Sequence, residues 1–219
     1  MERSYRDYFI IDGQHIGRYE DMYRNCPDPW RIEELGLRLD MRAALLLLEC
    51  SGRKISRFLD VGAGLGLFTG LLCREIWRKN PEAEGVVTDI SASAVAGAEK
   101  RLADPRLIFQ PLDVRELKEK PVFPSGHFDL VVMAQVLWGI LEDLDRILAC
   151  LADILSPDGL LLVSQHFPGP ERQTYGADIV ASPEDLAVKL TQAGLSVIEA
   201  LETNRDRNHH WAALIGRRT

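Results

Sequence analysis

A group of glycines preceded by an aspartate is the part of this sequence whose residue types and spacing best suit chemistry. Asp60, Gly62, Gly64 and Gly66 form the pattern D-x-G-x-G-x-G. Glycines permit unusual backbone dihedrals and let a ligand approach the main chain closely. The pattern lies between a short apolar stretch and an amphipathic stretch, so it joins a strand to a helix. Glycine loops bind nucleotide-like ligands in this context.

The spacing of the glycines separates the candidate ligands. A dinucleotide fingerprint needs G-x-G-x-x-G, but Leu67 and Thr69 stand where the third glycine would be. The G-K-[S/T] sequence of a Walker loop is also missing. An acid before the first glycine suits a ligand's ammonium group better than a pyrophosphate. The glycine spacing therefore disfavours an NAD-linked oxidoreductase.

Two more carboxylates follow predicted strands. Asp89 ends the second strand, where it could accept both hydroxyls of a ribose or could cap the next helix. Asp113 follows the third strand, where it could contact a ligand or remain a solvated loop acid. Because ligands bind at the carboxyl ends of strands in open α/β sheets, all three acids are candidates for one site.

The elements that would hold these residues alternate along the chain. Hydrophobic periodicity predicts strands and helices in turn, and a polar loop separates two further strands. The predicted strands are 57–61, 85–88, 107–110, 128–133, 160–164, 197–201 and 211–215, and the predicted helices are 65–79, 91–102, 142–155 and 183–193. We expect an α/β, Rossmann-like fold with a seven-stranded, mostly parallel sheet and helices on both faces.

From about Ile55 onward, these motifs resemble those of class I S-adenosylmethionine (SAM) dependent methyltransferases in their residues and in their order. The glycine loop is similar to the first motif of that family, 128–137 to its fourth, and Ser156-Pro157-Asp158-Gly159 to the turn before its fifth strand. The resemblance implies SAM as cofactor and a small-molecule methyl acceptor. It implies cofactor contacts from Asp60, Gly62, Ala63, Gly64, Gly66, Asp89, Ile90, Asp113, Val114 and Ala134.

Within this resemblance the three acids have separate roles. Asp60 would face the methionyl ammonium, Asp89 the ribose and Asp113 the adenine amino group, with the Val114 amide at the ring. A non-catalytic SAM-fold partner or regulatory protein is the alternative class. Its mark would be a decayed cofactor motif, whereas these acids are all present.

Within this family, the chain resembles methyltransferases of the nodulation N-methyltransferase (NodS) type. Tyr19 and Tyr23 before Asp28-Pro29-Trp30 carry it, together with Val136-Leu137-Trp138-Gly139. That group methylates an amine on a chitooligosaccharide, but the segment 166–181 departs from its pattern. A sugar or natural-product intermediate, methylated on O or N, is the acceptor that we expect.

The first 50 residues are predicted to form a helical cap or lid, with 51–219 as the SAM-binding core of a single domain. The aromatic residues before the sheet either pack permanently on its flank or close over the cofactor. As a lid, they would bring Trp30 near SAM and Arg42 to the methionyl carboxylate.

The acceptor side of the site is predicted from position. His166 follows the predicted fifth strand, and histidine titrates near neutrality, so it is the candidate general base; a packing or surface histidine is the alternative. Tyr175 could donate a hydrogen bond to the acceptor or anchor its loop, and Trp138 could line the acceptor pocket. His127 precedes the fourth strand, at the opposite edge.

Composition limits the partners. The net charge is −7 and the pI about 5.3, which disfavours nucleic acid as a partner. The four cysteines form no CxxC pair, so we expect no metal site. The sequence shows neither a signal peptide nor an apolar run long enough to cross a bilayer. We expect a cytoplasmic monomer or homodimer that does not bind membranes.

Overall fold

Among the described residues, the main sheet has seven strands in the order β5-β4-β3-β6-β7-β9-β8, and β9 runs opposite to the other six. The computed structural model describes residues 7–12, 14–31, 39–168, 173, 175–206 and 209–218. The strands are β3 (Arg57–Val61), β4 (Glu84–Asp89), β5 (Leu107–Pro111), β6 (Phe128–Ala134), β7 (Leu155–Pro168), β8 (Leu195–Asp206) and β9 (His209–Arg218). The predicted seven-stranded, mostly parallel sheet is confirmed.

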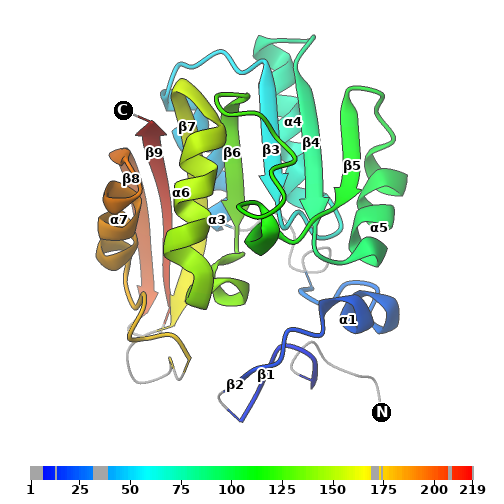
Figure 1. Cartoon of the computed structure of the whole chain (residues 1–219), viewed down its shortest axis with the longest axis vertical. Coiled ribbons are helices and arrows are strands. Elements are labelled where there is room, and N and C mark those ends of the chain that lie inside the picture. Colours follow the sequence, from blue (N-terminus) through cyan, green and yellow to red (C-terminus); the bar gives the residue numbers. More distant parts are fainter. Residues whose placement is uncertain are drawn as a thin grey trace.

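Helices cover both faces of this sheet (Figure 1). They are α3 (Leu39–Cys50), α4 (Leu67–Lys79), α5 (Ala92–Leu102), α6 (Leu144–Ile154) and α7 (Pro183–Gln192), with short 3-10 turns η2 (Val114–Glu116), η3 (Leu137–Gly139) and η4 (Leu141–Asp143). One buried cluster packs α6 and α7 against the sheet, and a second packs α3, α4 and α5 against the other face.

Alternate side chains of the central strand β6 belong to the two buried clusters, because successive residues of a strand point to opposite faces of the sheet. Val131 and Met133 belong to the cluster under α6, whereas Leu130 and Val132 belong to the cluster under α3 and α4. All four side chains are fully buried. A strand covered on both faces reads as a continuous apolar run, which explains why the sequence identified it readily.

The N-terminal segment lies beyond the carboxyl ends of the parallel strands (Figure 1). It consists of a hairpin, β1 (Ile10–Ile11) and β2 (Gln14–His15), followed by helix α1 (Tyr19–Asn25). The sequence predicted a helical cap here but not the hairpin, whose two-residue strands are too short to show a period. Residues 32–38 of the predicted cap lie outside the described residues.

Two predicted boundaries are corrected by the structure. Strand β7 continues to Pro168, because its ladder with β9 runs from the Leu160–Arg217 pair to the Pro168–His209 pair. His166 therefore lies inside this strand, opposite Trp211, and not in the loop after it. Helix α6 begins at Leu144 because η4 forms before it.

A glycine in β4 makes room for a buried ring on β3. Phe58 and Gly85 pair across the two strands, and a Cβ on Gly85 would overlap the fully buried Phe58 ring. We expect Gly85→Ala to lower the free energy of unfolding by about 1–3 kcal/mol, the usual cost of overpacking.

The smaller side chain of Phe58→Leu should relieve this overlap. Urea unfolding of both single variants and the double variant should therefore show a favourable coupling of about 0.5 kcal/mol or more. Additive losses would mean that the ring is not what limits residue 85.

Candidate active site

The glycine loop joins β3 to α4 at the carboxyl edge of the sheet. Gly62, Gly64 and Gly66 have φ angles of 68°, 56° and 74°, in the left-handed region that favours glycine. A Cβ on Gly62 would lie 2.6 Å from Val136 Cγ2, and one on Gly64 would lie 2.8 Å from the Tyr23 hydroxyl. The loop is thus closely approached by η3 on one side and by α1 on the other.

Asp89 fastens this loop to the end of β4. Its Oδ2 accepts a hydrogen bond of 2.9 Å from the Gly64 backbone N–H, and its Oδ1 accepts one of 2.9 Å from Ser91. The side chain is buried, and burial raises its pKa while the two backbone hydrogen bonds oppose that rise. Ser91 caps α5 by accepting from the Ala94 backbone N–H at 3.1 Å, so Asp89 is not the helix cap.

Asp60 is the second buried carboxylate beside the loop. Its Oδ2 accepts from the Thr69 hydroxyl at 2.7 Å, and burial raises the pKa of Asp60 to about 7. Within the described part of the chain, neither Asp60 nor Asp89 pairs with a cationic side chain. A cationic ligand group beside Asp60 would favour its ionised form.

Asp113 has a partner that sequence reasoning missed. Arg115 binds both of its carboxylate oxygens, with Nε–Oδ1 at 2.9 Å and Nη2–Oδ2 at 2.7 Å. Burial alone would raise the pKa of Asp113, but the hydrogen bonds and charge of Arg115 hold it below its ordinary value. A ligand group that approaches Asp113 must share the carboxylate with this guanidinium.

A cavity of about 440 Å³ lies between the strand ends and the N-terminal segment. Its size is within the range of small-molecule sites. Most predicted site residues line it: Trp30, Asp60, Gly62, Ala63, Gly64, Asp89, Ile90, Asp113, Val114, Ala134, Trp138 and His166.

Three predicted residues lie outside this lining. The side chain of Arg42 is exposed on α3, so the structure does not bring it to the cavity. Gly66 is the N-cap of α4 and lies against Ala98. The Tyr175 ring stacks on His15 with their centroids 5.6 Å apart, and neither residue belongs to the lining.

His166 reaches the cavity from β7. Its ring lies 4.4 Å from the Trp211 ring, and its backbone N–H donates to Gln135 Oε1 at 3.1 Å. Gln135 has a φ of 62° and donates through Nε2 to the buried carboxylate of Asp40 at 3.0 Å. The backbone on both sides of the cavity is thereby tied to α3, by contacts between residues too distant in sequence to predict.

The N-terminal segment contributes aromatic walls. Phe9, Tyr19, Tyr23 and Trp30 line the cavity, and Trp30 Nε1 donates to the Tyr23 hydroxyl at 3.0 Å. The Tyr19 hydroxyl lies 2.9 Å from His15 Nε2. Phe9 and His15 were not singled out by the sequence, because the hairpin that carries them has no detectable pattern.

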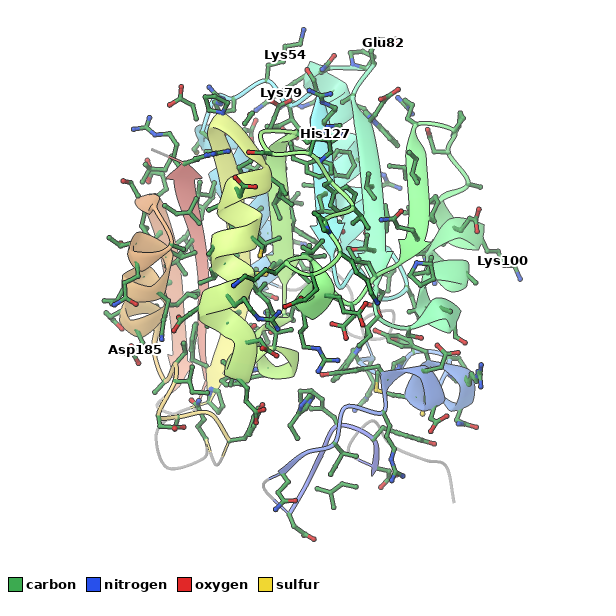
Figure 2. The ribbon with its side chains drawn as sticks, in the orientation of Figure 1. Lys54, Lys79, Glu82, Lys100, His127 and Asp185 are labelled. Atoms are coloured by element: carbon green, nitrogen blue, oxygen red, sulfur yellow. The ribbon has the colours of Figure 1, made fainter. Side chains whose placement is uncertain are left out.

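The opposite end of the sheet is distant from this site. Figure 2 shows His127 at the end of the molecule away from α1 and the hairpin. Asp129, in the same part of β6, accepts from the backbone N–H groups of Ser56 and Arg57 at 2.8 and 3.1 Å. Asp129 therefore has a structural role, since it binds the backbone that leads into β3.

The described residues contain no cluster of three or more His, Cys, Asp or Glu side chains that could hold a metal ion. None of the helices described is both long enough and apolar enough to cross a membrane.

Part of the chain is similar in sequence to known methyltransferases. The profile of the family described as "Methyltransferase domain" matches residues 59–161. The chain is 33% identical over 129 residues to the ubiquinone/menaquinone biosynthesis C-methyltransferase of Stutzerimonas stutzeri, covering 58% of this chain and 48% of that protein. It is 39% identical over 121 residues to an uncharacterized protein of Synechococcus, covering 51% and 27%. The chain thus spans less than half the length of either relative.

A solved structure agrees in fold. The N-methyltransferase NodS of Bradyrhizobium japonicum, in complex with S-adenosyl-L-homocysteine (SAH), superposes with a TM-score of 0.66 at 22% identity, covering 91% of this chain and 95% of that one. The matched segment 59–161 holds the glycine loop, Asp89 and Asp113 at one edge of the sheet. The chain therefore has the fold of a class I SAM-dependent methyltransferase, and its segment 59–161 matches the methyltransferase domain family.

Proposed function

We propose that this chain transfers the methyl group of SAM to an oxygen or nitrogen of a small-molecule acceptor. One observation carries the proposal: the lining of a single cavity combines acids and glycines with His166 and aromatic rings. The first part suits a cationic nucleoside, and the second suits an apolar acceptor that must lose a proton.

The residues fit SAM by their chemistry. Among the described residues, the two buried carboxylates have no cationic partner, which would match an ammonium group at Asp60 and ribose hydroxyls at Asp89. Gly62 and Gly64 line the cavity without a Cβ, so a ligand could approach their main chain closely, and Asp113 with the Val114 amide would meet the adenine. When bound, SAM supplies an activated methyl group with a good leaving group.

The chain itself would align the reacting groups, exclude water from them and supply a proton acceptor. Alignment of reacting groups can be worth roughly 7–11 kcal/mol of the barrier. Trp30 and Tyr23 cover the glycine loop and exclude water there. His166 would take the proton of a hydroxyl or ammonium acceptor through its imidazole.

The acceptor class follows from the walls and from the cavity's size. Trp211 lies beside His166, and Phe9 and Trp138 add aromatic faces to the same lining, which favour a small acceptor with an apolar or sugar-like body. Similar proteins are named for N-methylation and for C-methylation. A screen should therefore include hydroxyl, amine and carbon-acid acceptors, with SAH formation as the readout; NAD-dependent oxidation serves as the rival activity.

The first test is cofactor binding. SAM or SAH at about 100 times its dissociation constant should stabilise the fold by about 2.7 kcal/mol. At this chain length that corresponds to a melting shift of about 2–4 °C per kcal/mol. A shift with NAD but with neither SAM species would contradict the proposal.

Asp89 offers a residue-level test with a matched control. We expect Asp89→Ala to weaken SAH binding by about 1.5–3 kcal/mol, because it removes a charged acceptor from the site. Asp129→Ala also removes a strand-end carboxylate with two backbone hydrogen bonds, but at the far end of the sheet. Calorimetry should show near-normal SAH affinity for the control, and equal affinities for both variants would exclude a ligand role for Asp89.

His166 can be tested against His127 in the same way. Once an acceptor is known, His166→Ala should lower turnover about 100- to 10,000-fold with little change in SAH affinity. It should also remove the fall in rate on the acidic side of the pH profile. His127→Ala, at the opposite end in Figure 2, should leave turnover unchanged. Near-normal turnover of His166→Ala would remove this residue from the mechanism.

A further inference from the structure

Helix α1 is attached to the amino end of α5 through one carboxylate. Glu20 Oε2 accepts from the Ser91 hydroxyl at 2.6 Å and from the Ser93 backbone N–H at 3.1 Å. Its Oε1 accepts from the Ser93 hydroxyl at 2.7 Å. A hydroxyl of Ser91 and both donors of Ser93 hold the pKa of Glu20 at about 2, so the group is charged at any physiological pH.

The neighbours of Glu20 on α1 both reach the cavity. Tyr23, three residues later, places its hydroxyl at Gly64 and accepts from Trp30. Tyr19, the preceding residue, places its hydroxyl against Gly139 in η3. One turn of helix therefore carries the attachment to α5 together with contacts to both sides of the cavity.

The attachment of Glu20 is also connected by hydrogen bonds to Asp89 and the glycine loop. Ser91, which donates to Glu20, has its own backbone N–H bound to Asp89 Oδ1. Asp89 in turn accepts from Gly64, the residue that Tyr23 covers. Glu20, Ser91, Asp89, Gly64 and Tyr23 form a closed circuit of contacts between the N-terminal segment and the glycine loop.

We propose that Glu20 is a positioning residue that holds the N-terminal segment over the glycine loop and so sets the affinity for SAM. This inference rests on the proposed function for its cofactor, while the attachment itself is independent of it. Glu20 acts through Tyr23 and Trp30 and does not line the cavity itself.

The chemistry of the contact requires a full-length carboxylate. All three partners donate, and a carboxylate only accepts, whereas a glutamine would turn an NH₂ group toward one of these donors. A negative charge is also favoured at the amino end of a helix by the helix dipole. Glu20→Gln should therefore break the attachment with almost no change of shape.

The experiment compares Glu20→Gln with Arg24→Ala. Arg24 forms only a surface ion pair with Glu20, with Nε–Oε1 at 2.9 Å and the Arg24 side chain 65% exposed, so its removal should matter little. We expect Glu20→Gln to weaken SAH binding roughly 10- to 100-fold and to speed hydrogen exchange across 18–31, as for lost hydrogen bonds to a charged group. Arg24→Ala should stay within about twofold of the unchanged protein.

Ser93→Ala approaches the same contact from α5 and serves if Glu20→Gln does not fold. It should weaken SAH binding about three- to tenfold, and adding it to Glu20→Gln should cost little more. A positioning role requires a higher KM for SAM with a smaller change in kcat once an acceptor is found.

Normal SAH affinity with unchanged exchange at 18–31 in Glu20→Gln would overturn the inference, as would strictly additive effects of the two substitutions. If the unchanged protein binds neither SAM nor SAH, the proposed function fails. In that case hydrogen exchange across 18–31, compared between the ligand-free unchanged protein and Glu20→Gln, still decides whether Glu20 holds the segment.

Discussion

The backbone N–H of Gly64 donates to the buried carboxylate of Asp89, and the cavity takes its form from this bond. It fixes the middle of the glycine loop to the neighbouring strand, so the loop turns at the edge of the sheet and leaves its main chain accessible. The left-handed backbone of the loop permits this path, and α1 can then approach Gly64 because no side chain intervenes. If that bond were lost, both the floor of the cavity and the surface on which Tyr23 rests would change.

Charge is distributed unevenly around the cavity. Among the described residues of its lining, five aspartates face one guanidinium, and that guanidinium already neutralises one of them. Burial raises the pKa of Asp60 and Asp89, so a cation beside them favours their ionised form, and a concave surface rich in carboxylates raises the local concentration of cations. A sulfonium cofactor carries such a charge and loses it on methyl transfer. The same surface therefore attracts the donor more strongly than the demethylated product.

The sequence predicted the parts of the site that local pattern encodes. The glycine loop, Asp60, Asp89 and the strand ends were found because each lies directly after an apolar run, where a parallel sheet places its ligands. The bond between Asp113 and Arg115 was missed, although the two are only two residues apart, because many such pairs are solvated. Gln135 could not have been paired with Asp40 from sequence, since 95 residues separate them. Phe9 and His15 lie on a hairpin too short to have a hydrophobic period.

The sheet order sets a sequence of events during synthesis. Strand β8 is made before β9, yet in the described sheet β9 lies between β7 and β8 and is the only strand that β8 contacts. Until β9 emerges from the ribosome, β8 has no partner and β7 keeps an open edge, so the nascent chain carries unpaired backbone groups on both. Trp211 belongs to β9, so the cavity also lacks one wall until then. The glycine loop and its acids belong to the part of the chain released earlier, whereas the wall that Trp211 supplies is completed only with β9.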